Sequence, residues 1–80
     1  MPTILRLNGF RLFFYSNEGG KIPHVHVEYQ SSVAKFWINP VDLSGNFGMN
    51  ASELSKAFEL VSKHEKQILE EWNAFFSHKK

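Results

Sequence analysis

The chain has no cysteine, little net charge and no long apolar run, and each absence narrows the class of protein. Without cysteine, a disulfide-stabilised scaffold and a zinc site built on thiolates are both excluded. A net charge of +1 is too small for binding nucleic acid by bulk charge alone, although a local basic patch can still form. No segment approaches the roughly 20 apolar residues of a membrane span. No basic region followed by an apolar signal stretch opens the sequence, so we expect a cytoplasmic protein without a membrane partner.

Length and aromatic content favour one domain over residues 1–80. A domain of this size buries only about 60% of the surface that its unfolded chain exposes, so its stability margin is small. The chain has eight Phe, two Trp and two Tyr. Each buried aromatic side chain removes about 150–250 Å² from water, which makes a compact core feasible without a cross-link.

The apolar pattern predicts an α+β fold with strands first and helices last. We expect about four antiparallel strands within residues 3–43, at 3–7, 10–15, 24–29 and 33–38, and a short edge piece at 41–43. Asn8-Gly9 favours a tight hairpin turn, and the polar, Gly-rich stretch 16–21 favours a loop. A further loop is expected around Gly45 and Gly48.

Helical spacing of apolar residues begins near residue 50 and continues to about residue 77. Asn50 followed by Glu53 resembles a capping box, which marks a helix start. Ser62 followed by Glu65 repeats that signal in the middle of the apolar stripe. The sequence therefore predicts either two abutting helices or one helix kinked near residues 62–64, packed on one face of the sheet.

The segment at 23–29, with sequence PHVHVEY, has the most informative pattern of the chain. Successive side chains of a strand point to opposite faces, so His24, His26 and Glu28 share one face and the valines and tyrosine share the other. One face is apolar and belongs to the core. The opposite face presents two imidazoles and a carboxylate, which are groups that move protons and bind metals near neutral pH.

A two-residue turn after Tyr29 would place further polar and aromatic residues on the same face. This pairing sets Glu28 opposite Val33, His26 opposite Lys35, and His24 opposite Trp37. Alternation in the first two strands adds two arginines, a phenylalanine and a tyrosine. The predicted outer face therefore carries Arg6, Arg11, Phe13, Tyr15, His24, His26, Glu28, Val33, Lys35 and Trp37.

Acid–base chemistry on RNA is one use of such a face. His24 and His26 are the candidate catalytic residues, with Glu28 as a further candidate. Cationic side chains beside them could stabilise the charge that develops on a phosphate, and aromatic rings could stack on unpaired bases. The candidate substrate-binding residues are Arg6, Arg11, Lys35, Trp37 and Tyr15.

Two other uses of this face remain open. His-x-His with Glu28 resembles the two-histidine, one-carboxylate set of some metal enzymes. Residues at i and i+4 of a strand lie roughly 13 Å apart, however, so Glu28 cannot easily share an ion with His24, and we expect no metal and no cofactor. The alternative is an ordinary solvated sheet face whose exposed aromatics bind a partner protein.

Several stretches resemble the bacterial domain-of-unknown-function family 4160. They are FFYSNEG at 13–19, PHVHVE at 23–28, AKFWINPV at 34–41, Gly48, residues 53–54, Glu65, Leu69, Trp72 and Phe76. The family usually has two prolines before the first histidine, and Ile22 replaces the first of them here. No catalytic residues carry over from the family; only the positional match of His24, His26, Lys35 and Trp37 does, and it assigns them no role.

This resemblance implies a small stand-alone prokaryotic protein that is paired with a second small protein in a toxin–antitoxin module. We therefore expect the toxin component of a type II module, held by a cognate antitoxin-like protein, with RNA or translation as its target through the His-x-His strand. The alternative is a non-catalytic binding or regulatory module that uses the aromatic and basic sheet face.

Overall fold

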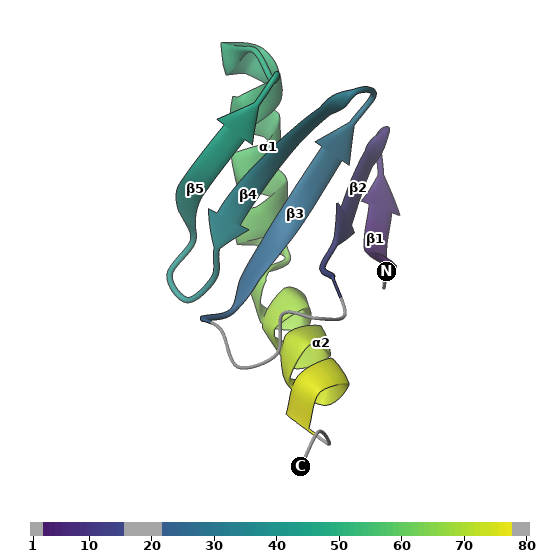
Figure 1. The fold of residues 1–80 in the computed structure, drawn as a ribbon, viewed down its shortest axis with the longest axis vertical. Coiled ribbons are helices and arrows are strands. Elements are labelled where there is room, and N and C mark those ends of the chain that lie inside the picture. Colours follow the sequence, from purple (N-terminus) through teal and green to yellow (C-terminus); the bar gives the residue numbers. More distant parts are fainter. Residues whose placement is uncertain (1–2, 16–21, 78–80) are drawn as a thin grey trace.

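The computed structural model describes residues 3–15 and 22–77, which form one antiparallel sheet and two helices. The predicted α+β fold is confirmed. The strands are β1 (Thr3–Leu7), β2 (Phe10–Phe13), β3 (His24–Tyr29), β4 (Ser32–Trp37) and β5 (Asp42–Phe47), and they lie in this order across the sheet. The helices are α1 (Ala51–Lys63) and α2 (Glu65–Ser77). Figure 1 shows both helices on one side of the sheet, with α2 continuing past its end.

Two tight hairpins fix the register of the central strands. Asn8 and Gly9 both have positive φ, 53° and 85°, as the predicted two-residue turn between β1 and β2 requires. The β3–β4 pairing places Glu28 opposite Val33 and continues in register to the strand ends, as predicted. The expected loop at 16–21 lies outside the described residues.

The fifth strand is an element that the sequence did not predict in full. Only a short piece at 41–43 was expected, yet β5 runs from Asp42 to Phe47 and pairs antiparallel with β4. Its sequence, DLSGNF, has little β-propensity, so pairing with β4 decides its conformation. A register shift between Lys35 and Phe36 marks a bulge in this pair.

The core lies between the helices and the sheet face that turns toward them. It is formed by alternate residues of β2, β3 and β4 together with one stripe of each helix. Val25, Val27 and Tyr29 face the core as predicted, and Leu7 at the sheet edge is 39% exposed. The buried core residues are Phe10, Leu12, Val25, Val27, Ala34, Phe36, Ile38, Met49, Ala57, Val61 and Ile68.

The helical region consists of two helices that meet at His64. The capping box at the start of α1 is confirmed: Asn50 Oδ1 accepts a hydrogen bond from the Glu53 N–H at 2.8 Å, and the Asn50 N–H donates to Glu53 Oε1 at 3.1 Å. The His64 N–H donates to the Leu60 carbonyl, and its own carbonyl accepts from Ile68. Backbone hydrogen bonding therefore continues through the bend. Each helix has 13 residues, and neither is long and apolar enough to cross a membrane.

Beside the main core, a cluster of aromatic side chains joins α2 to the end of the sheet. Phe14 follows β2 and is 1% exposed, with its ring centroid 5.4 Å from that of Trp72 and 5.5 Å from those of Phe75 and Phe76. Trp72 is buried, while the two phenylalanines of α2 are half-buried. This cluster covers the end of the sheet beyond the main core.

Candidate functional site

The outer face of the sheet is the face opposite the helices, and it brings most of the predicted site residues together. Cross-strand pairing arranges them in rows. The rows are Arg6, Arg11, Glu28, Val33 and Phe47; then Thr3, Phe13, His26, Lys35 and Gly45; then His24, Trp37 and Asp42.

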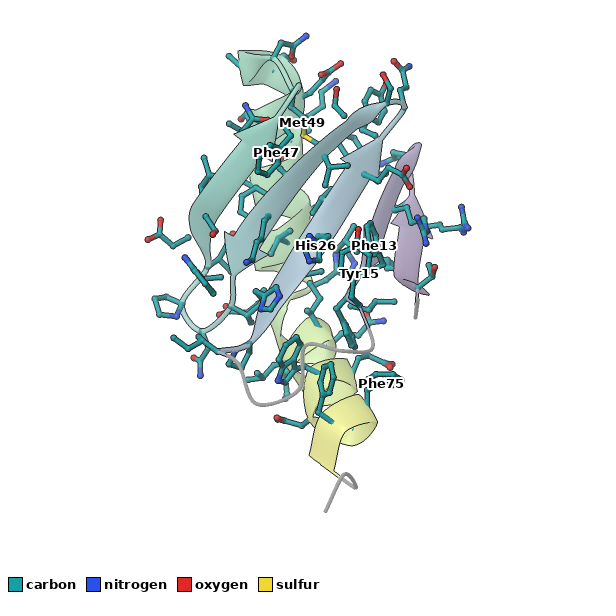
Figure 2. The ribbon with its side chains drawn as sticks, viewed as in Figure 1. Phe13, Tyr15, His26, Phe47, Met49 and Phe75 are labelled. Atoms are coloured by element: carbon teal, nitrogen blue, oxygen red, sulfur yellow. The ribbon has the colours of Figure 1, made fainter. Side chains whose placement is uncertain are left out.

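Three rings at the centre of this face form a contact cluster around His26. The His26 ring stacks on Phe13, with centroids 5.4 Å apart and planes 23° apart, and meets the edge of Tyr15 at 4.8 Å. Figure 2 shows these three side chains lying together in front of the sheet. Phe13 is only 3% exposed although it points away from the core, because its neighbours cover it. His26 is thus half-buried in an aromatic setting rather than surrounded by solvent.

Arg11 and Glu28 form an ion pair beside this cluster. Arg11 Nη1 lies 2.8 Å from Glu28 Oε1, and Arg11 Nε donates to Thr3 Oγ1 at 3.1 Å. The Arg11 guanidinium also lies 4.4 Å from the centroid of the Phe13 ring. These contacts fix the position of the guanidinium. The charges of Arg11 and Glu28 therefore neutralise each other within the protein.

His24 lies on the predicted side of β3, but it is buried, with 1% of its surface exposed. Its ring centroid lies 5.0 Å from Trp72 of α2 and 5.8 Å from Trp37 of β4. Nδ1 lies 2.8 Å from the carbonyl oxygen of Ile22, and since a carbonyl only accepts, Nδ1 carries the hydrogen. The alternation of side chains predicted that His24 would be exposed to solvent. It is buried because α2 extends past the end of the sheet and its Trp72 covers the ring.

The remaining candidates lie around the margin of the outer face. Lys35 is half-buried, and its Nζ lies 5.0 Å from the Trp37 ring, a cation–π arrangement. Arg6 is exposed on β1, at the edge of the sheet. Phe47 of β5 is 68% exposed and belongs to the same face. Sequence reasoning missed Phe47 because it did not predict that β5 reaches this residue.

The geometry gives little support for a metal centre on this face. Within residues 3–15 and 22–77, no group of three His, Cys, Asp or Glu side chains is close enough to hold an ion. Glu28, the carboxylate of the predicted His-x-His-x-Glu set, instead pairs with Arg11. The arrangement can stack rings, hold two cationic side chains and present one partly exposed imidazole.

Comparison with known proteins gives one match. Residues 9–73 match the model of a family described as a domain of unknown function, DUF4160. That range contains both histidines of β3, the whole of β2 to β5 and of α1, and most of α2. No curated protein and no solved structure matches the chain.

Proposed function

Since the chain belongs to the DUF4160 family, which defines no activity, we propose a function from its surface: the outer face of the sheet binds a partner protein. The observation that supports this best is the continuous set of rings and cations from Arg11 across His26 to Lys35. All of it lies on the part of the outer face that neither described helix covers, apart from His24, which α2 covers (Figure 2). Binding, not catalysis, is then the role of the His-x-His strand.

The composition of the outer face fits a protein partner. The central part of protein interfaces is enriched in Tyr, Trp, Phe and Arg. Tyr15 is 41% exposed and Phe47 is 68% exposed, and large apolar side chains exposed on one face mark interaction surfaces. Arg6 at the margin adds a cationic site that could pair with a carboxylate of the partner.

The surroundings of the two histidines argue for binding over acid–base chemistry. A general acid and a general base must both reach the reacting atoms. His24 is buried between two tryptophans, and the ring of His26 lies against Phe13 and Tyr15. The arginine nearest to them is already paired with Glu28. One partly exposed imidazole on an aromatic surface is better suited to contact than to a two-residue proton relay.

The proposed partner is a cognate small protein of the antitoxin type, in keeping with the expected two-protein module. The product of the adjacent gene is the partner to test. Its affinity for the purified chain can be measured by isothermal titration calorimetry. We expect Tyr15→Ser, beside His26 at the centre of the face, to weaken binding by about tenfold or more, and Phe47→Ser at the margin to weaken it by a smaller factor.

Phe58→Ser is the matched control for that measurement. Phe58 is a similarly exposed phenylalanine, at 45%, but it lies on α1, on the other side of the sheet. Its substitution should leave the affinity unchanged. Absence of binding by the unmodified chain, or an equal loss in all three variants, would refute the proposal.

A second candidate function is that of a toxin that acts on RNA. It is favoured by one observation: His26 and Lys35 are cross-strand neighbours, and the partly exposed ring of Tyr15 lies beside His26. A positioned imidazole and ammonium next to a stacking ring could engage a phosphate and an unpaired base.

Induced expression in bacteria tests this second function. We expect growth arrest by the unmodified chain, and relief of arrest by His26→Ala and by Lys35→Ala, since each removes a group placed at the phosphate. Lys66→Ala, at an exposed position on α2, is the control and should still arrest growth. Arrest by every variant would eliminate chemistry at His26. No arrest by any of them would leave only the binding function.

A further inference from the structure

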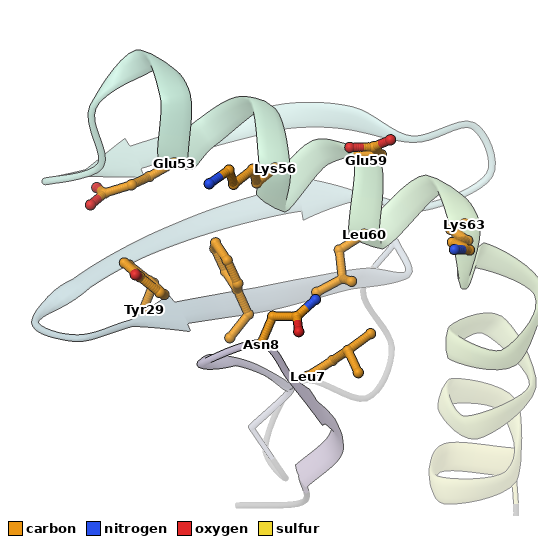
Figure 3. Close-up of a pocket in the computed structure, with 9 residues that line it drawn as sticks. Leu7, Asn8, Tyr29, Glu53, Lys56, Glu59, Leu60 and Lys63 are labelled. Atoms are coloured by element: carbon orange, nitrogen blue, oxygen red, sulfur yellow. The ribbon is translucent and has the colours of Figure 1, made fainter.

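A cavity of about 410 Å³ lies on the helix side of the sheet, between α1 and the β1–β2 hairpin. The space exists because α1 packs mainly over β4 and β5, toward the other edge of the sheet. Leu7, Phe10 and Tyr29 line it as cross-strand neighbours in one row, and Leu7 is 39% exposed. Figure 3 shows Leu60 of α1 pointing from the helix toward the hairpin. Apolar side chains of the helix and the hairpin are thus left partly uncovered at this edge.

The charged residues along the same side of α1 alternate in sign. In chain order they are Glu53, Lys56, Glu59 and Lys63, and all four line the cavity (Figure 3). Intervals of three and four residues keep them on one side of the helix. No ion pair joins these four to other residues of the described segments, 3–15 and 22–77. Two carboxylates and two ammonium groups leave this side without net charge, but the order of the charges is regular.

This order of charges is complementary to itself when a second α1 lies antiparallel to the first. A two-fold axis then sets Glu53 level with Lys63 of the second copy, and Lys56 level with Glu59 of the second copy. The midpoints of these two pairs differ by half a residue, roughly 0.8 Å of helix rise, so one axis serves both pairs. Parallel helices would instead place each charge beside its own copy. The pattern therefore favours the antiparallel orientation and opposes the parallel one.

The apolar side chains fit the same arrangement. Leu60 is half-buried on this side of α1 and falls level with Lys56 of the second copy. The aliphatic stem of a lysine can cover apolar surface while its ammonium stays in water beside a carboxylate. Leu7 and the half-buried Tyr29 extend this apolar surface from the helix onto the hairpin. Association would thus remove apolar area from water as well as pair the charges.

We propose that a second copy of the chain docks at this cavity, with the two α1 helices antiparallel and their charges paired. The contact is isologous, since the same surface of each copy supplies both halves of it. The outer face lies on the other side of the sheet from the helices (Figure 1). The dimer therefore leaves the outer face open to the proposed protein partner and does not depend on that partner.

Sedimentation equilibrium of the purified chain tests the proposal. We expect a monomer–dimer equilibrium in a series up to about 1 mM chain, which detects dissociation constants as weak as millimolar. In a Lys56→Glu homodimer two carboxylates would face each other, and in a Glu59→Lys homodimer two ammonium groups would. Each substitution acts at both symmetry-related pairs and should raise the dimer dissociation constant about tenfold. Glu53 is left unchanged because it belongs to the capping box of α1.

Combining the two charge reversals separates charge pairing from any loss of fold. An equimolar mixture of Lys56→Glu chains and Glu59→Lys chains should form a heterodimer, because the two substituted positions then carry opposite charges. The double variant Lys56→Glu/Glu59→Lys should dimerise like the unmodified chain for the same reason. Lys66→Glu, at an exposed position of α2 outside the cavity, is the control and should leave the dimer unchanged.

Four results would each overturn the proposal. The first is an unmodified chain that stays monomeric throughout the concentration series. The second is a single charge reversal that dimerises as well as the unmodified chain. The third is a mixture and a double variant that associate no better than the single reversals. The last is a loss in the Lys66→Glu control equal to the loss in Lys56→Glu.

Discussion

At the scale of single residues, the two histidines of β3 lie on the same face of the strand but differ in burial. Both lie on the predicted side of the strand, and their ring centroids are 5.4 Å apart. His24 is buried beside Trp72, whereas His26 is half-buried on the open face. Burial makes the first a part of the packing between sheet and α2, and partial exposure leaves the second available for contacts.

This difference predicts unequal losses of stability. His24→Ala should lower the free energy of unfolding by about 2–3 kcal/mol, because it opens a cavity among buried rings. His26→Ala removes a ring that solvent can partly replace and should cost about 1 kcal/mol or less. Urea unfolding of both variants measures the two values. Equal losses would contradict the buried placement of His24.

At the scale of elements, the end of β5 is shaped by a turn that returns the chain to α1. Asn46 closes it with two hydrogen bonds at 3.0 Å: its Nδ2 donates to the Met49 carbonyl, and its Oδ1 accepts from the Met49 N–H. Gly48 lies within this turn with φ +108°, and a Cβ there would be 2.9 Å from Ser32 Oγ. The turn brings Asn50 into place as the cap of α1.

Gly48→Ala should therefore destabilise the protein by about 1–3 kcal/mol, since alanine is strained at this φ and meets the start of β4. Gly45→Ala, within β5 and three residues before Gly48, is the matched control. A Cβ at Gly45 would meet only the ring of Phe47, at 3.2 Å, and this exposed side chain can turn aside. Thermal unfolding compares the two variants. If the Gly48→Ala variant were as stable as the Gly45→Ala variant, the claim that alanine is strained at position 48 would be wrong.

At the scale of the whole molecule, sequence periodicity was enough for the order of elements, the central register and the start of α1. Each depends on local patterns: alternation in β3 and β4, turn residues between them, and the Asn50–Glu53 box. Periodicity could not predict the full length of β5, whose polar residues are held in a strand by pairing with β4. It also could not predict the burial of His24. That burial depends on the path of α2 past the sheet, which no local pattern contains.

The sheet order follows the chain order without a single crossover. Every strand therefore pairs only with the strands next to it in the sequence, and no pairing requires a distant segment of the chain. Chain-entropy losses on closing such short loops are small, and folds dominated by local contacts reach the native state quickly. During synthesis each strand can therefore pair with one that precedes it in the chain, and the helices, which come last, supply the side chains that cover the apolar face of the sheet.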